Sequence, residues 1–573
     1  AGAKGVVKVE VPESWKNCED EGLDYAVVSG GRKDVVDFVN NIQTKVSAQE
    51  GNTLPVSAFK DYADGSTPSG SSAYEKRGIA VNVPTWDPTK CIQCNFCSYV
   101  CPHAVIRPAV MTEEEAANAP EGMKMLDMTG MPGKKFAVTV SVLDCTGCGS
   151  CANVCPGMKG EKALNMNPLE TQLAEEKMFN YGQSVSEKPE VLEKFKENSV
   201  KGSQFKQPLL EFSGACAGCG ETPYAKLITQ LFGDRMYIAN ATGCSSIWGN
   251  SSPSTPYTVN RAGKGPAWDN SLFEDNAEFG MGMLLAQNAI RGGLKAKVEE
   301  VLANTGDEAV KAACQEYLDT YNSGVTNGPA TDKLVAVLEA QDCGVCQDIV
   351  KNKDFLSKKS QWVFGGDGWA YDIGFGGVDH ILASGKDINV MVFNTEVYSN
   401  TGGQASKATP TGAVAQFAAG GKEVKQKDLA GIAMSYGYVY VAQISMGADY
   451  NQTVKAIAEA EAYPGPSLII AYAPCINHGI KKGMSKAQTE EKLAVETGYW
   501  NMFRYNPAAE KKFILDSKAP SKDFQEFISG EVRYTSLALK DADKAARLQA
   551  QAAENAKERY EYLQKLQTLY GDN

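Results

Sequence analysis

The chain has 573 residues and a mass of 61.5 kDa, a length that predicts roughly three domains. Its 57 Lys and Arg residues against 69 Asp and Glu residues leave a net charge of −12, without the basic excess typical of proteins that bind nucleic acids or anionic membranes. With 43% hydrophobic and 22% charged residues, and no apolar run near the roughly 20 residues of a membrane-spanning helix, the composition is globular.

The N-terminal residues predict the end of one domain and the approach to another. Residues 6–11 alternate as a strand does, as if a domain were already under way at Ala1. We therefore expect residues 1–35 to end a preceding α/β domain, and the chain to be the C-terminal portion of something longer or one half of a split enzyme. Residues 36–84 begin with a helical pattern, pass into the turn-rich DGSTPSGSS and predict a linker or small connecting domain.

Sixteen cysteines beside three histidines are the unusual feature of the composition. The chain is long and opens without a signal peptide, which favours metal ligation in the cytoplasm over a secreted disulfide framework. Eight cysteines form two runs of the pattern C-x2-C-x2-C-x3-C-P, the second 54 residues after the first. The two runs are Cys91, Cys94, Cys97 and Cys101, and Cys145, Cys148, Cys151 and Cys155.

This double pattern is typical of bacterial ferredoxins with two 4Fe-4S clusters, in which the fourth cysteine of each run crosses to the other cluster. The predicted ligand sets are Cys91, Cys94, Cys97 with Cys155, and Cys145, Cys148, Cys151 with Cys101. Structural zinc is the alternative, but zinc sites use paired cysteines rather than triplets closed by Cys-Pro. We expect an α+β ferredoxin-like domain over residues 85–170 that passes single electrons to a soluble ferredoxin, and a polar connector over residues 171–205.

Residues 206–540 alternate short apolar runs with helical stretches, which predicts an α/β domain with a doubly wound, mainly parallel sheet. Strands are expected over residues 235–241, 361–366, 388–394, 439–445 and 467–473, and crossover helices over residues 370–385, 428–437 and 451–463. Residues 270–345 predict a helix-rich insertion within this domain. Residues 541–573 predict a charged, exposed C-terminal helix.

Chemically active residues follow four of the predicted strands: Cys244, Asp367, Thr395 and Cys475. Because ligands of open parallel sheets bind beyond the carboxyl ends of the strands, we expect these residues to meet at one edge. Cys216 and Cys219 could complete a third cluster there with Cys244 and Cys475. The alternative is that all four are buried free cysteines, which behave as small hydrophobes.

The same edge carries a pattern that resembles the thiamine-diphosphate motif. A GDG triplet at residues 366–368 follows one strand and an NTEVYSN loop at residues 394–400 follows the next, with 25 residues between them. A diphosphate needs Mg²⁺ to neutralise it, and the Asp367 carboxylate, the Thr395 hydroxyl and the Val397 carbonyl are the candidate ligands. The GDG triplet alone is also an ordinary turn. Thiamine diphosphate is an electron sink for decarboxylation of a 2-oxo acid, and an iron–sulfur chain can remove the two electrons singly.

Longer motifs carry a resemblance along the whole chain. They are CAGCGE, ATGCSSIWGN, SSPSTPYTVNRAGKGPAWDNSLFEDNAEFGMGM, GGDGWAYDIG, NTEVYSNTGGQ and YAPCINHG. The chain resembles the C-terminal half of the pyruvate:ferredoxin (flavodoxin) oxidoreductases. The two ferredoxin runs are generic to many redox proteins, whereas the long run favours the single-chain pyruvate enzymes over their multi-subunit 2-oxo acid relatives.

The resemblance implies a set of site residues. Cys216, Cys219, Cys244 and Cys475 would hold a third 4Fe-4S cluster next to thiamine diphosphate and Mg²⁺. The cofactor would be lined by Glu221, Cys244, Gly366, Asp367, Gly368, Trp369, Thr395, Glu396, Val397, Tyr398, Ser399 and Asn400. Of these, Glu221 and Asn400 are the candidate catalytic residues, and Asn400 would also face the substrate.

The resemblance also implies a reaction and partners. Pyruvate, CoA and two oxidised ferredoxins, or flavodoxin in their place, would give acetyl-CoA, CO2 and reduced acceptor. An N-terminal portion absent from this chain would supply the glutamate that activates the aminopyrimidine and much of the CoA site. The whole enzyme would be a homodimer in the cytoplasm. This chain alone is therefore expected not to turn over.

Two alternatives remain open at this point. The enzyme could act on another 2-oxo acid, such as 2-oxoglutarate or indolepyruvate, or the chain could be a non-catalytic electron-transfer module in which GDG is a turn. Cys18, Cys314, Cys343 and Cys346 have no assigned role. For Cys343-Gly-Val-Cys346, two unrelated thiols near a turn are favoured over a redox pair.

Overall fold

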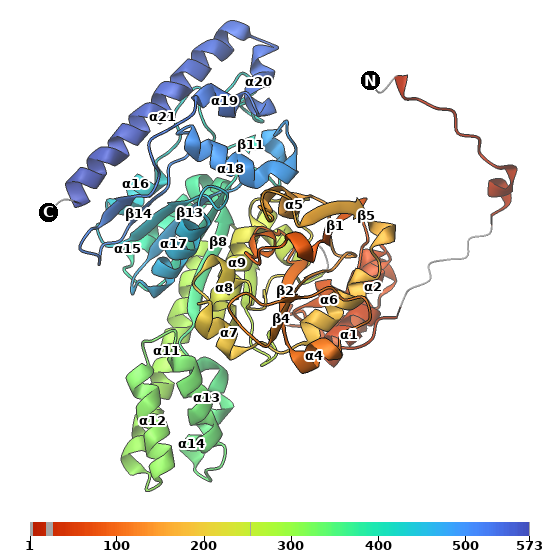
Figure 1. Ribbon diagram of the computed structural model, residues 1–573. Helices are drawn as coiled ribbons and strands as arrows, with labels where there is room; N and C mark the ends of the chain where they lie inside the picture. Colours follow the sequence, from red (N-terminus) through yellow and green to blue (C-terminus); the bar gives the residue numbers. More distant parts are fainter. Residues whose placement is uncertain (1–3, 19–26, 252–253, 572–573) are drawn as a thin grey trace. The chain divides into compact units, whose positions relative to one another are not determined.

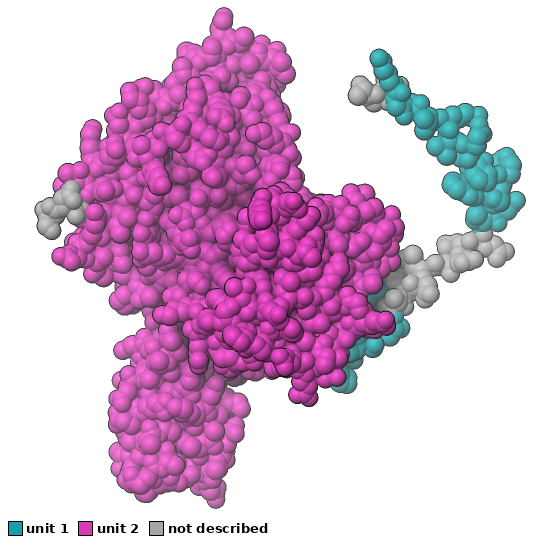
Figure 2. Space-filling view, viewed as in Figure 1, with its two compact units in different colours: residues 1–68 teal, residues 69–573 magenta. Residues whose placement is uncertain are grey.

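A computed structural model describes residues 4–18, 27–251 and 254–571 of the chain (Figure 1). It divides into two compact units, Ala1–Pro68 and Ser69–Asn573, coloured separately in Figure 2. Among the described residues, no helix combines the length and the hydropathy that crossing a membrane requires.

The smaller unit contains the helical stretch expected near residue 36. It runs as α1 (Lys33–Phe38), a π-helical turn (Val39–Gln43) and α2 (Thr44–Ser47), followed by 3₁₀ turns at Gly51–Thr53 and Val56–Tyr62. The strand expected over residues 6–11 is wrong: these residues are exposed and pair with no other described strand. Residues 1–3 and 19–26 of the predicted preceding α/β domain lie outside the described residues.

The larger unit begins with the ferredoxin-like part. Two small antiparallel sheets form it, one of β1 (Asn82–Trp86) and β5 (Leu164–Pro168), the other of β2 (Ile106–Thr112), β4 (Lys134–Val140) and β3 (Leu126–Asp127). The short helices α3 (Phe96–Tyr99) and α5 (Ser150–Val154) each carry a cysteine of one run. The helices α4 (Glu113–Ala117), α6 (Glu175–Ser184), α7 (Pro189–Lys194) and α8 (Val200–Ser203) complete this region.

The second part is built on an eight-stranded sheet with the order β15-β14-β12-β13-β9-β8-β6-β7. The predicted strands are β6 (Met236–Ala241), β8 (Ser360–Gly366), β9 (Asn389–Asn394), β12 (Tyr440–Ile444) and β13 (Ser467–Tyr472). They are parallel, as is β7 (Ala267–Ser271), whereas β14 (Phe503–Tyr505) and β15 (Phe513–Leu515) are antiparallel. The predicted fold class, a mainly parallel α/β sheet preceded by an α+β ferredoxin-like domain, is confirmed.

Both faces of this sheet are buried. Val390 and Val392 of β9 contribute to one hydrophobic core, and Met391 and Phe393 contribute to the other. The first core contains α15 (Phe375–Ala383) and α16 (Leu429–Met434), and the second contains α9 (Thr222–Phe232) and α17 (Tyr450–Ala462). Because each side chain of a strand between two helix layers is buried, the strands are continuous apolar runs in the sequence.

The helix-rich insertion is confirmed, and it projects from the sheet at the foot of Figure 1. It comprises the end of α11 (Asn276–Asn304) with α12 (Glu308–Thr320), α13 (Asn327–Leu338) and α14 (Gly344–Lys351), which share a core of their own. The favoured interpretation of Cys343 and Cys346 is wrong, because the two form a disulfide at the start of α14. Cys314 is a buried free thiol in the same core.

The C-terminal helix α21 (Ala542–Gly571) is less exposed than expected. It packs against β15 and α20 (Val532–Ala538), and Ala545, Leu548 and Leu563 are buried. The helix α19 (Phe524–Ile528) contacts α21, and α18 (Ala487–Glu496) contacts α19.

Candidate functional site

The four strands that precede the predicted active residues are neighbours in the sheet, in the order β13, β9, β8 and β6. Cys475, Thr395, Asp367 and Cys244 follow these strands in the same order, at the carboxyl ends. The convergence expected from the sequence is therefore built by four adjacent parallel strands.

Asp367 is fully buried at this edge, and its carboxylate accepts hydrogen bonds on both oxygens. Oδ1 accepts from the Thr395 backbone N–H at 3.1 Å and from the Thr395 hydroxyl at 3.0 Å, and Oδ2 accepts from the Ser406 hydroxyl at 2.6 Å. Burial raises the pKa of Asp367 to about 7, although the bonds from Ser406 and Thr395 oppose that shift. Ser406 was not predicted from the sequence, because it lies in a loop without a motif.

The predicted magnesium ligands lie together. The Thr395 Oγ1 atom is 3.0 Å from Asp367 Oδ1 and 3.1 Å from the Val397 carbonyl oxygen, and it is 2.6 Å from the Ser399 hydroxyl. A carboxylate, a carbonyl and hydroxyl groups are oxygen donors, which suit Mg²⁺. The donor set therefore fits a magnesium ion held at the end of β8 and β9.

The backbone at Gly368 lies against an aromatic ring. A Cβ atom on Gly368 would be 2.5 Å from Cδ1 of Tyr398, and one on Gly365 would be 2.4 Å from Cε3 of Trp369. The Tyr398 ring belongs to β10 (Val397–Tyr398), which forms a hairpin with β11 (Gln404–Ala405). Gly368 lets the GDG turn approach the NTEVYSN loop closely, and Gly365 makes room for the Trp369 ring of the same segment.

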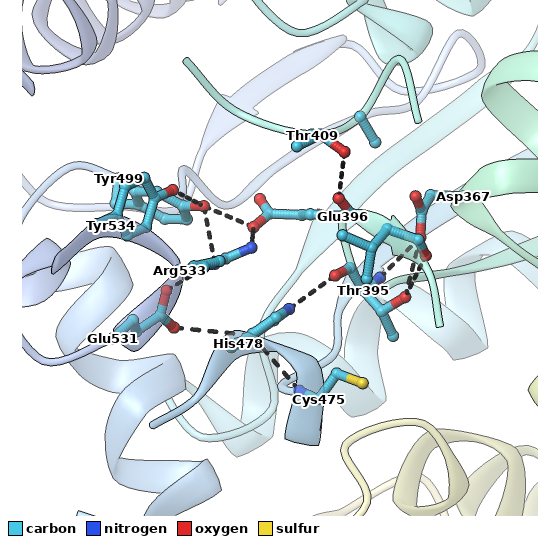
Figure 3. Close-up of polar contacts among 12 residues, drawn as sticks. Asp367, Thr395, Glu396, Thr409, Cys475, His478, Tyr499, Glu531, Arg533 and Tyr534 are labelled. Atoms are coloured by element: carbon cyan, nitrogen blue, oxygen red, sulfur yellow. Dashed lines mark hydrogen bonds and ion pairs between the residues drawn. The ribbon is translucent and has the colours of Figure 1, made fainter. Parts of the chain in front are cut away.

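Glu396 differs in orientation from its neighbours. Its backbone has a φ of 62°, and its buried carboxylate lies 2.8 Å from Arg533 and accepts a hydrogen bond from the Tyr499 hydroxyl at 2.5 Å. Figure 3 shows this carboxylate directed toward Arg533, on the side opposite Asp367. The Glu396 carbonyl in turn accepts a hydrogen bond from the Thr409 hydroxyl at 2.6 Å. The side chain of Glu396 thus stabilises the loop by its contacts with Arg533 and Tyr499. Arg533 was not among the predicted site residues, because it lies far from the loop in the sequence.

The cysteines of the ferredoxin-like part gather in two groups. Cys91, Cys94, Cys97 and Cys155 line one small cavity, and Cys101, Cys145, Cys148 and Cys151 line another. These are the crossed sets expected from the spacing. In the described ranges no three His, Cys, Asp or Glu side chains are close enough to share one metal ion. A 4Fe-4S cube binds each thiolate to a different iron, so its ligands surround a volume rather than a point.

A third group of thiols lies at the sheet edge. Burial raises the pKa of Cys244, and Glu221 and the other three thiols of the group, Cys216, Cys219 and Cys475, raise it further. The loops that carry them are joined, because the Gly220 N–H donates to the Pro474 carbonyl at 3.1 Å. The structure therefore places these four cysteines near one another at the sheet edge, with Glu221 beside Cys219, Cys244 and Cys475.

The three thiol groups lie in a row. The Gly218 backbone lies close enough to Cys148 to oppose the rise in pKa that burial causes there, so the third group adjoins the Cys101, Cys145, Cys148 and Cys151 group. Cys97 lies near enough to Cys151 to raise its pKa, after burial as the main cause. His103 is buried, and its Nδ1 is 3.0 Å from the Ser213 carbonyl at the same junction.

The two candidate catalytic residues have different surroundings. The Glu221 carboxylate is buried and accepts a hydrogen bond from Trp248 Nε1 at 2.7 Å, and burial raises its pKa to about 7. Asn400 is exposed in the loop between β10 and β11. That loop is tied to the Cys475 segment, since Asn477 Nδ2 donates to the Ser399 carbonyl at 3.2 Å.

Three family models match the chain. They are described as "EKR: Domain of unknown function" over residues 30–80, "4Fe-4S dicluster domain" over residues 90–158 and "Thiamine pyrophosphate enzyme, C-terminal TPP binding domain" over residues 344–471. The second covers both cysteine runs, and the third covers the GDG triplet and the NTEVYSN loop. An iron–sulfur domain and a thiamine-binding domain are therefore both present.

Curated relatives match nearly the whole chain. The "Pyruvate-flavodoxin oxidoreductase" of Enterobacter agglomerans is 54% identical over 99% of this chain and 48% of its own length. The "Pyruvate:ferredoxin oxidoreductase" of Moorella thermoacetica is 54% identical over 98% of this chain and 48% of its own. The "Pyruvate-flavodoxin oxidoreductase" of Klebsiella pneumoniae is 49% identical over 99% and 48%. The chain thus spans about half the length of these relatives.

Proposed function

We propose that this chain, which is related along nearly its whole length to about half of the pyruvate:ferredoxin (flavodoxin) oxidoreductases, works as the electron-exporting part of such an enzyme. Together with the other half it would convert pyruvate, CoA and two oxidised ferredoxins, or flavodoxin, into acetyl-CoA, CO2 and the reduced acceptor. Three 4Fe-4S clusters in this chain would carry the electrons out.

One observation supports this proposal more than any other. The Ser399 hydroxyl is 2.6 Å from Thr395 Oγ1 in the oxygen cluster, and the Ser399 carbonyl accepts a hydrogen bond at 3.2 Å from Asn477, two residues after Cys475. A site for a magnesium diphosphate and a group of four thiols therefore share one loop. An electron-transfer module alone would have no need of the oxygen cluster.

Different residues of the chain would bind the magnesium ion and the diphosphate. Asp367, Thr395 and Val397 would hold Mg²⁺, and the segment from Gly366 to Trp369, with Tyr398, would receive the diphosphate at the turn after β8. When bound, thiamine diphosphate supplies an electron sink for decarboxylation of a 2-oxo acid.

Glu221 and Asn400 would complete the site. The buried Glu221 carboxylate is kept in place by Trp248 and adjoins the third thiol group. The exposed Asn400 amide projects from the loop that carries the magnesium ligands and would contact pyruvate. The companion half would supply the remaining pyruvate and CoA contacts, and the whole enzyme would be a homodimer.

Iron content and thiamine binding test the cofactor assignment. Three clusters require about twelve iron atoms per chain, and the oxygen cluster requires that thiamine diphosphate bind only with Mg²⁺. About eight iron atoms and no thiamine binding would contradict the proposal and leave only the ferredoxin-like clusters. Acetyl-CoA formation by this chain in the absence of its companion half would contradict the proposed division between the halves.

A further inference from the structure

We propose that His478 is a positioning residue that joins the magnesium-binding loop to the third thiol group. The inference rests on the function proposed above. His478 is one of three histidines in the chain and lies three residues after Cys475, in a 3₁₀ turn (Ile476–His478) at the end of β13. Its side chain is completely buried.

The imidazole ring contacts both parts of the site. The Cys475 N–H donates to Nδ1 at 3.4 Å, and Nε2 lies 2.7 Å from the Thr395 carbonyl oxygen (Figure 3). A carbonyl can only accept, so Nε2 must carry the proton. Nδ1 accepts a hydrogen bond and is therefore unprotonated. His478 thus links a proposed cluster ligand to a proposed magnesium ligand through one neutral ring.

The ring is held in place from behind. The Tyr472 ring stacks on the imidazole with 6.2 Å between the ring centroids, and Glu531 Oε1 lies 3.7 Å from Nδ1, too far for a hydrogen bond. Glu531 accepts from Arg533 Nε at 2.7 Å, and Arg533 pairs with Glu396, the residue next to Thr395. The contacts of Glu531, Arg533 and Glu396 lead from the residue behind the ring to the magnesium loop, as Figure 3 shows. The ring therefore cannot rotate without breaking its hydrogen bonds with the Cys475 N–H and the Thr395 carbonyl.

The hydrogen bonds of His478 fix the backbone in both parts of the site. The bond to the Thr395 carbonyl helps to fix the residue whose own N–H and hydroxyl face Asp367. The bond from the Cys475 N–H fixes the backbone that orients the Cys475 thiol. His478 therefore sets the position of the oxygen cluster relative to the thiol group, without touching substrate.

Two conservative variants of the complete enzyme test the two hydrogen bonds of His478 separately. His478→Asn keeps an acceptor near the position of Nδ1 and loses the donor, whereas His478→Gln keeps a donor near the position of Nε2 and loses the acceptor. We expect His478→Asn to weaken Mg²⁺-dependent thiamine diphosphate binding about fivefold to tenfold and to leave the third cluster's EPR spectrum and midpoint potential unchanged. We expect His478→Gln to keep thiamine affinity within about twofold and to shift the potential of the third cluster only.

The exposed His380 in α15 gives a matched control, and His380→Asn and His380→Gln should match the parent enzyme in both measurements. The proposal is overturned if the two His478 variants affect thiamine binding and the cluster alike, or if neither measurement changes. Asp367→Asn and Cys475→Ser, measured in parallel, separate this failure from failure of the proposed function. Loss of thiamine binding in the first and of the third cluster in the second would leave the proposed function standing even when His478 fails.

Discussion

At the scale of single residues, the site depends on a buried carboxylate, Asp367, whose negative charge is not balanced by a positively charged side chain among the described residues. Asp367 receives three hydrogen bonds but has no cation as a partner among the described residues, and burial raises its pKa. Burial of an ionised carboxylate is costly unless an opposite charge is near. A bound divalent cation would supply that charge.

Replacement of Asp367 by alanine should therefore abolish Mg²⁺-dependent binding of thiamine diphosphate, because the variant removes the charged ligand. Iron content should stay that of the parent protein, since the hydrogen-bond partners of Asp367 in the described part of the chain are Thr395 and Ser406 and include no cysteine. Calorimetric titration with thiamine diphosphate and Mg²⁺ checks the first expectation, and iron analysis checks the second. Retained thiamine affinity would mean that another residue binds the metal.

Cys475→Ser should affect only the third thiol group. The two ferredoxin-like groups lie in cavities that do not include Cys475, so iron should fall from about twelve atoms toward about eight, or by one atom if the cluster converts. EPR spectroscopy of the reduced protein should show the two remaining clusters unchanged. An unaltered iron count would exclude Cys475 as a ligand.

Gly368→Ala tests the close approach of the two loops. Its Cβ would meet the Tyr398 ring at 2.5 Å, and such overpacking typically costs about 1–3 kcal/mol. We expect a lower Tm and weaker thiamine binding. Gly376→Ala in α15 is the control, because a Cβ there meets nothing within 4 Å, and it should leave both quantities unchanged.

At the scale of elements, the sequence predicted the parallel strands because each is buried on both faces and is therefore an apolar run. It did not predict β7, because about half of the residues in AWDNS are polar. It did not predict β14 and β15, because each has only three residues, too few to show an alternating pattern. The two ferredoxin-like cysteine groups followed from spacing alone, whereas the third followed from the expected meeting of the strand ends and from the family resemblance. His478 stood in a quoted motif, but Ser406 and Arg533 lie in segments without a pattern, and only the fold brings them to Asp367 and Glu396.

The helix-rich insertion contains a cross-link that spacing did not favour. The Cys343–Cys346 disulfide joins the N-cap residue of α14 to the first turn of the same helix, where Cys346 is part of the insertion's core. Closing so short a loop stabilises by at most about 2 kcal/mol in the chain-entropy view. Cys343→Ser should therefore lower the stability of α14 slightly and leave cluster and thiamine contents unchanged.

Hydrogen exchange of the α14 amides measures this effect, with Cys314→Ser as a comparison. Cys314 is a buried thiol of the same core outside the disulfide, so its variant should loosen α12 rather than the start of α14. Equal protection of α14 in the parent and in Cys343→Ser would show that the cross-link adds nothing to local stability.

At the scale of the whole molecule, the ferredoxin-like part and the sheet meet through backbone contacts beside the clusters' ligands. Gly218 has a φ of 78° and lies close to Cys148, and a Cβ there would lie 2.7 Å from the Met484 carbonyl oxygen. Gly218→Ala should displace this backbone and slow reoxidation of the third cluster, with all iron retained. Freeze-quench EPR checks the rate.

Gly160→Ala is the matched control for that variant. Gly160 has a similar φ of 84°, but a Cβ there meets nothing within 4 Å. Its variant carries the same left-handed strain of about 1–2 kcal/mol without the clash. Equal electron-transfer rates in the two variants would assign the effect to backbone strain and not to the contact between the two parts.

The arrangement of the three thiol groups bears on the rate of electron transfer. The buried Lys226 of α9 donates to the Tyr99 carbonyl at 3.0 Å, so the helix beside the third group grips the helix of the first cysteine run directly. A carrier domain on a flexible tether must swing between its docking positions, and its turnover is limited by that diffusion. The proposed relay would lie within parts that are joined directly, so the waiting time for each electron would be set by the arrival of the external acceptor.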